Sequence, residues 1–125
     1  MSYSIAEVAE RSGLSADTLR YYEKIGLIDP PPRDSGGRRS YTQEDLSWVA
    51  FLLRLRSTGM PIRLMKEYAD LRRIGPVTAG RRKDILIEHR EEIQLRMAEM
   101  QAFLEVLDRK IDNYAEIAAK EDRKQ

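Results

Sequence analysis

The sequence predicts a mainly α-helical protein: a winged helix-turn-helix head at residues 1–75, followed by one long helix at residues 76–125. Three observations predict this architecture. Two short helical segments meet at the glycine-containing turn "SGLS", a proline- and glycine-rich stretch follows them, and a heptad pattern fills the C-terminal third of the chain.

Two consecutive helix starts and stops define the predicted helix-turn-helix. Ser4 and Glu7 form the S-x-x-E pattern of a capping box, and Gly13 can end that helix in a left-handed conformation. Ser15 is the expected N-cap of the second helix, which runs to about residue 25 and is closed by Gly26. A tight turn between two crossed helices is typical of this motif.

The segment "LIDPPPRDSGGRRSY" predicts a wing. Its three prolines forbid a helix and permit only edge-strand pairing, and "DSGG" is a turn signal. We expect Ile28 and Tyr41, on either side of this segment, to pair as a short β-hairpin.

Two further helices complete the head. Thr42 is the expected cap of a third helix, with Asp45 at the third helical position, and the apolar residues that follow make it the central core helix. Gly59 ends this helix. Pro61 suits the first turn of a fourth helix, which should reach about Arg73.

The long helix is predicted from about residue 78 to residue 119, where nothing breaks the pattern. Apolar residues recur there with heptad spacing and charged residues between them, which is typical of a coiled coil. An intramolecular bundle is the alternative, but the chain has no second long helix to complete it, so we expect a homodimer. The predicted dimer-interface residues are Leu86, Ile93, Met97, Met100, Leu104, Leu107, Ile111 and Tyr114.

Composition excludes several classes of protein. The 125 residues contain no cysteine, so disulfides, thiolate metal sites and cysteine nucleophiles are excluded. No signal peptide and no membrane-spanning run is recognisable, and a cytoplasmic protein is expected. Phosphate loops, nucleophile elbows and paired catalytic carboxylates are also missing, so we do not expect an enzyme. The net charge of +1 by itself predicts no partner.

The stretch "TLRYYEKIGLI" carries the main functional signal. Leu19, Tyr22 and Ile25 share one helical face, which should pack on the core and leave the Tyr22 hydroxyl at its edge. Arg20 lies on another face, where it can contact a phosphate or a guanine edge, and Tyr21 can donate its hydroxyl to a phosphate. An exposed arginine is usually only a solvated charge, and a tyrosine pair usually serves packing. Together with the basic wing, however, the pattern favours DNA binding.

Three segments, "YSIAEVAERSGLSADTLRYYEKIGLI", "GRRSYTQEDL" and "LRSTGMPI", closely resemble the MerR family of bacterial transcription regulators. The resemblance covers about residues 2–72. It implies a homodimer, joined by an antiparallel coiled coil, that binds a pseudo-palindromic promoter site and distorts its spacer for RNA polymerase. The segments that carry over as DNA contacts give the candidate residues Ser15, Ala16, Asp17, Thr18, Arg20, Tyr21, Tyr22, Lys24, Arg33, Arg38, Arg39 and Tyr41. Arg38 stands where family wings often carry tyrosine.

The sequence does not identify an effector. Some members of a similar branch sense aldehydes or electrophiles with a cysteine that would fall near Arg54, and thiol chemistry is impossible here. A lone His89 without partner ligands does not predict a metal site, and no cofactor is expected. A constitutive or architectural DNA-binding protein remains an alternative, and a coiled-coil adaptor for another protein is a weaker one.

Overall fold

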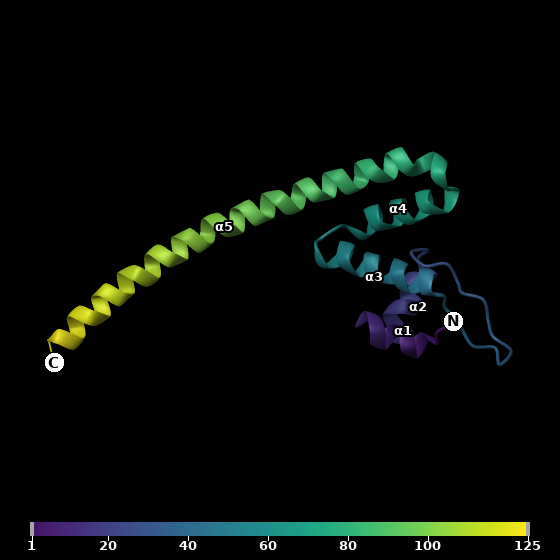
Figure 1. The fold of residues 1–125 in the computed structure, drawn as a ribbon, viewed down its shortest axis with the longest axis horizontal. Helices are drawn as coiled ribbons and strands as arrows, with labels where there is room; N and C mark the ends of the chain where they lie inside the picture. Colours follow the sequence, from purple (N-terminus) through teal and green to yellow (C-terminus); the bar gives the residue numbers. More distant parts are fainter. Residues whose placement is uncertain (1, 125) are drawn as a thin grey trace. The chain divides into compact units, whose positions relative to one another are not determined.

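The computed structural model describes residues 2–124 and consists mostly of helices (Figure 1). Between residues 2 and 124 no strand exceeds a single bridged pair. The mainly helical fold with a long C-terminal helix is therefore confirmed. The elements are α1 (Ile5–Ser12), α2 (Ala16–Lys24), α3 (Gln43–Ser57), α4 (Ile62–Ile74), the 3-10 turn η1 (Pro76–Thr78) and α5 (Ala79–Arg123).

The predicted caps form at the starts of α1 and α3. Ser4 Oγ accepts a hydrogen bond from the Glu7 backbone N–H at 3.1 Å, and the Glu7 carboxylate accepts one from the Ser4 N–H at 3.1 Å. Thr42 and Asp45 form the same reciprocal box. Gly13 ends α1 with φ of 77°, a left-handed conformation that glycine adopts without a Cβ clash. These local signals set the helix boundaries of the head.

The chain forms two compact units, one ending at Leu86 and the other beginning at Ile87. In the first unit α1 packs on α2 and α3, and α3 packs on α4. Val8, Leu52 and Met65 are fully buried in its core, and Ile85 from the start of α5 is 1% exposed in the same core. The first unit therefore includes the first turns of α5, and the predicted boundary after residue 75, between a DNA-binding domain and a dimerisation helix, stays a prediction.

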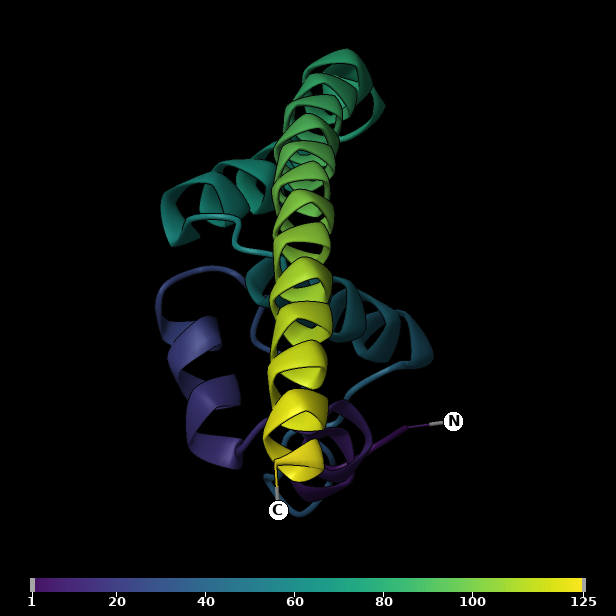
Figure 2. The same cartoon turned by 90° about the vertical axis from the view of Figure 1, so that its left-hand side faces the viewer.

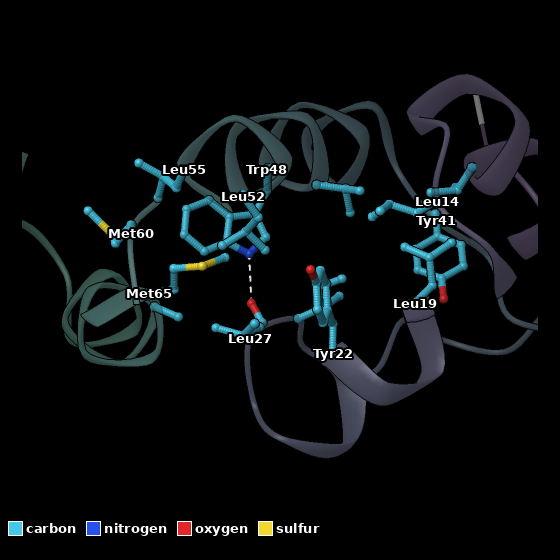
Figure 3. Packing of buried hydrophobic residues seen from close by; sticks show 14 of the residues in the cluster. Leu14, Leu19, Tyr22, Leu27, Tyr41, Trp48, Leu52, Leu55, Met60 and Met65 are labelled. Carbon is cyan, nitrogen blue, oxygen red and sulfur yellow. Dashed lines mark hydrogen bonds between the residues drawn. The ribbon is translucent and has the colours of Figure 1, made fainter. Parts of the chain in front are cut away.

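A core hydrogen bond also holds the segment that follows α2. The Trp48 indole Nε1–H of α3 donates a buried hydrogen bond of 2.8 Å to the Leu27 carbonyl, just beyond α2 (Figure 3). Leu27 itself is fully buried. A buried carbonyl needs such a partner, so this bond ties the chain leaving α2 to the central helix.

The wing differs from the hairpin predicted for it. Tyr41 pairs with Tyr3 rather than with Ile28, through two backbone hydrogen bonds of 2.8 Å. Within the wing, Arg33 and Arg39 form a single antiparallel bridge. The predicted pairing of Ile28 with Tyr41 was therefore wrong. Ile28 instead enters the core, and the prolines that follow it have no N–H to continue a ladder.

α5 contains 45 residues. Both views draw it as one uninterrupted helix (Figures 1 and 2). At 1.5 Å per residue this corresponds to a length of roughly 67 Å. Within residues 2–124 every helix is too short or too polar to cross a bilayer.

Candidate nucleic-acid interface

The inner face of α2 holds the helix on the core. Leu19 is fully buried and Tyr22 is 2% exposed, as expected from their spacing. The Tyr22 hydroxyl accepts a hydrogen bond from Arg56 Nη1 of α3 at 3.1 Å. Tyr22 therefore belongs to the packing side, and its place among the predicted DNA-binding residues is not supported by its burial.

The outer face of α2 presents charged and aromatic groups to solvent. Asp17 has a side chain that is 95% exposed, and Arg20 is 49% exposed in its side chain. The two form an ion pair of 3.0 Å across one helical turn. Tyr21 is 50% exposed and Lys24 is exposed as well. Such an exposed ion pair contributes little to stability, so Arg20 can exchange Asp17 for another anion at small cost.

The N-terminus of α2 is organised by its cap. Ser15 Oγ accepts a hydrogen bond of 3.0 Å from the Thr18 backbone N–H, and the two side-chain oxygens lie 2.9 Å apart. Ala16 and Thr18 are half-buried. The cap satisfies one of the free N–H groups of the first turn, where the helix dipole also favours anions.

The wing tip is preorganised by its own contacts. Asp34 Oδ1 accepts hydrogen bonds from the N–H groups of Gly36 and Arg38 at 2.9 and 3.0 Å. Arg33 Nη1 donates to the Gly37 carbonyl at 2.9 Å. The Arg38 guanidinium is exposed and forms no ion pair or side-chain hydrogen bond within residues 2–124. The tip therefore displays one unpaired cation on an ordered turn.

The base of the wing behaves differently from its tip. Arg39 donates Nε and Nη2 hydrogen bonds to the two carboxylate oxygens of Glu23 at 2.9 and 3.4 Å. The hydrogen bond to Glu23 raises the pKa of Arg39 further above its usual value. Tyr41 is 1% exposed, and burial raises the pKa of its hydroxyl. Tyr41 therefore packs in the core, and its burial does not support its prediction as a DNA-facing side chain.

Some residues that position this surface were not found from the sequence. Arg73 of α4 donates to the Gly26 carbonyl and to the carboxylates of Asp29 and Asp70. A Cβ built on Gly26 would lie 3.8 Å from Lys66 Cε, which places a second α4 cation at the same turn. Arg73 is 47 positions from Gly26, and no local pattern links residues so far apart in the chain.

The predicted dimer seam divides into two parts. Leu86 packs half-buried against the core of the first unit, so part of its apolar surface is already covered there. Ile93 is half-buried. The remaining predicted residues, Met97, Met100, Leu104, Leu107, Ile111 and Tyr114, are between 39% and 71% exposed. Phe103 and Ile117, which the heptad pattern did not include, widen the stripe at 60% and 53% exposure.

Family models match most of the chain. The model for the MerR HTH family regulatory protein matches residues 3–71, and the model described as MerR, DNA binding matches residues 46–110. The chain belongs to the MerR family. It is a DNA-binding transcription regulator of that family, and the relatives it matches are regulators rather than enzymes.

Individual relatives match nearly the whole MerR chain. The HTH-type transcriptional regulator YyaN of Bacillus subtilis is 34% identical over 95% of both chains. A crystal structure of a MerR family transcriptional regulator from Listeria monocytogenes is 43% identical, with a TM-score of 0.89, over 98% of this chain and 95% of that one. HiNmlR, a MerR family regulator lacking the sensor domain and bound to promoter DNA, is 34% identical with a TM-score of 0.85, over 95% and 94%.

No metal-binding cluster of three or more His, Cys, Asp or Glu side chains lies within residues 2–124. His89 of α5 has a pKa lowered first by burial and then by the positive charge of Arg96. The neutral imidazole is therefore favoured, but the geometry around it assembles no set of metal ligands.

Proposed function

We propose that this regulator acts as a homodimer whose two α5 helices pair in antiparallel fashion. The observation that carries this proposal is the exposed apolar stripe of the second unit, from Met97 to Ile117. Contiguous apolar surface of this kind marks an interaction site, and heptad spacing suits a second helix. Pairing would bury the stripe and join two DNA-binding units.

On DNA, we propose that α2 enters the major groove and the wing lies on the backbone. Arg20, half-exposed and held only by a surface ion pair, is placed to read a base edge as well as a phosphate. Tyr21 and Arg38, both exposed, suit phosphate contacts, which fix position rather than sequence. Ser15, Ala16, Asp17, Thr18, Lys24 and Arg33 remain candidates along the same surface.

The similarity to HiNmlR supports promoter DNA as the target. We further propose that the dimer binds a pseudo-palindromic site in the promoter spacer and distorts it, so that RNA polymerase can use the promoter. This action places the protein with the chromosome in the bacterial cytoplasm. HiNmlR lacks a sensor domain, so a second candidate is constitutive regulation without an effector.

Footprinting on the DNA upstream of the chain's own gene tests the operator. We expect two protected half-sites related by a two-fold axis, with centres one helical turn of about 34–36 Å apart, or a multiple of it. A single asymmetric footprint would contradict the dimer arrangement. Transcription with purified polymerase and no added small molecule then separates constitutive from effector-dependent action.

Disulfide cross-linking tests the helix direction, because the natural chain has no cysteine. In antiparallel pairing, Ile93→Cys and Tyr114→Cys should each fail to cross-link with itself, since each lies far from the two-fold axis. Parallel pairing would cross-link both variants with themselves. A mixture of the Ile93→Cys and Tyr114→Cys proteins should form a cross-link between position 93 of one subunit and position 114 of the other, if these two positions face each other in the antiparallel pair.

A further inference from the structure

A pocket of about 480 Å³ lies in the first unit, outside the DNA-facing surface. Its walls come from α3, α4 and the first turn of α5, and include Trp48, Phe51, Tyr68, Arg72 and Arg82. The pocket is wide open to solvent, and its volume falls within the range of about 300–1,000 Å³ that is typical of small-molecule sites. The pocket therefore has room for a compact ligand.

The pocket wall is aromatic and already ordered. Trp48 and Tyr68 stack with ring centroids 5.9 Å apart, and Phe51 lies 6.1 Å from Trp48 and 5.8 Å from Tyr68. Phe51 and Tyr68 are only partly buried. A planar apolar ring can pack along their exposed sides, and an ordered wall reduces the entropy lost on binding.

Two of the polar residues that line the pocket, Arg72 and Arg82, are cationic. The Arg72 guanidinium lies 4.3 Å from the Trp48 ring centroid and forms no ion pair or hydrogen bond within residues 2–124. Arg82 is held by hydrogen bonds to the Thr78 hydroxyl and the Gly75 carbonyl at 3.1 and 3.3 Å. One acid, Glu44, is among the lining residues. An arginine fixed on a ring with its N–H groups unpaired suits a carboxylate.

The same wall connects to the turn after α2. Trp48 donates its indole hydrogen bond to Leu27, and Arg73, the neighbour of Arg72, holds the Gly26 carbonyl and Asp29. A group that changes the position of Trp48 or of this end of α4 therefore acts on the segment between α2 and the wing. The connection consists of direct contacts from pocket wall to turn.

We propose that this pocket binds a small planar aromatic carboxylate, whose ring packs against Phe51 and Tyr68 and whose carboxylate pairs with Arg72. Binding would shift Trp48, and through its hydrogen bond to Leu27 would alter the turn after α2. This site lies on the first unit and needs neither a metal nor a cysteine.

The single tryptophan makes the test direct, because Trp48 supplies the one indole N–H signal in a nitrogen–proton NMR spectrum. The probe is 2-naphthoate, titrated into the full chain without DNA. We expect a saturable shift of the indole signal. The neutral analogue 2-naphthalenemethanol should bind about tenfold more weakly, because a hydrogen bond to a charged group is lost.

Variants of the same helix locate the carboxylate. Arg72→Gln should weaken naphthoate binding about tenfold, whereas Arg63→Gln, an equal loss of charge outside the pocket, should leave it unchanged. Tyr68→Leu, checked by thermal melting, should weaken binding of naphthoate more than that of cyclohexanecarboxylate, which has no aromatic ring. The proposal is overturned if naphthoate leaves the indole signal unchanged, or if Arg72→Gln binds as the natural chain does.

The link to DNA is a separate measurement that rests on the proposed function. Saturating naphthoate should change operator affinity, and operator DNA should change naphthoate affinity by the same factor. Intact naphthoate binding with no reciprocal change would overturn the coupling while leaving the pocket assignment in place. Failure of the operator footprint would instead concern the DNA-binding mode.

Discussion

The Arg39 guanidinium of the wing and the Glu23 carboxylate of α2 form a bidentate ion pair, in which Nε and Nη2 donate hydrogen bonds of 2.9 and 3.4 Å. Their side chains are only 22% and 15% exposed. The pair joins the wing to the recognition helix, so the two elements that would meet DNA are held together before DNA arrives. Arg39 is thus engaged by Glu23 in the free protein, and its role as a DNA contact stays a prediction.

Glu23→Gln should loosen the wing and reduce the difference between the affinity for operator DNA and the affinity for random DNA. The lost pair should cost about 1–2 kcal/mol of stability, between the values typical of exposed and fully buried pairs. Because the change also removes a negative charge, non-specific affinity should rise slightly. Binding to operator and scrambled duplexes at two salt concentrations measures both effects.

Glu10→Gln is the matched control for that variant, because Glu10 is exposed and forms no ion pair within residues 2–124. It removes the same charge without releasing Arg39. If both variants change operator and random binding alike, the ion pair has no part in positioning the wing.

Arg20→Ala should weaken operator binding by about 1–3 kcal/mol and reduce specificity, if Arg20 reads a base edge. Tyr21→Phe removes only a hydroxyl and should weaken binding to operator DNA and to random DNA equally, by about 0.5–1.5 kcal/mol. Equal losses on both duplexes for Arg20→Ala would show a phosphate contact instead. Base recognition would then have to come from residues near Ala16 to Thr18.

Tyr22 should affect stability rather than DNA recognition. Tyr22→Phe removes the acceptor for Arg56 and should cost about 0.5–1.5 kcal/mol, whereas Tyr22→Ala also leaves a cavity and should cost about 3–5 kcal/mol. Thermal melts measure the difference. A Tyr22→Ala protein that melts like the natural chain yet loses DNA would reverse the assignment of the two tyrosines.

Met100→Asp should favour monomers, because the proposed dimer would bury its charge without a partner. Met100 is 71% exposed in the isolated chain, so the monomer itself should remain folded. Ala102→Asp, on the opposite side of α5, is the control and should leave the dimer intact. Sedimentation at micromolar concentration measures the oligomeric state of each protein. A natural chain that is already monomeric at this concentration would contradict the proposed dimer interface.

Local signals in the sequence predicted the helices well. Capping side chains and a left-handed glycine act within three or four residues, so Ser4, Thr42 and Gly13 could be assigned from their neighbours alone. The amphipathic spacing of α2 likewise predicted that Leu19 and Tyr22 face the core. These features do not depend on how distant segments meet.

Contacts between distant segments were harder to predict. Tyr41 was predicted as a DNA contact because the family resemblance carries over the wing from Arg33 to Tyr41, but Tyr41 is buried and pairs with Tyr3, 38 positions earlier in the chain. The three-way contacts of Arg73 and the capture of Arg39 by Glu23 also depend on the folded arrangement. The sequence shows that an arginine carries a charge, but only the folded structure shows whether its guanidinium is paired within the protein or exposed to a ligand.

The inward side chains of α2 are buried in the core and Ser15 caps its start, while the outward Asp17 and Arg20 pair with each other. Substitutions at Asp17, Arg20, Tyr21 and Lys24 would therefore leave the core bonds of Tyr22 and Trp48 untouched. Operator preference and foldability are separable in this chain. A library randomised at those four positions should yield stable regulators that recognise different operator sequences while keeping the same fold.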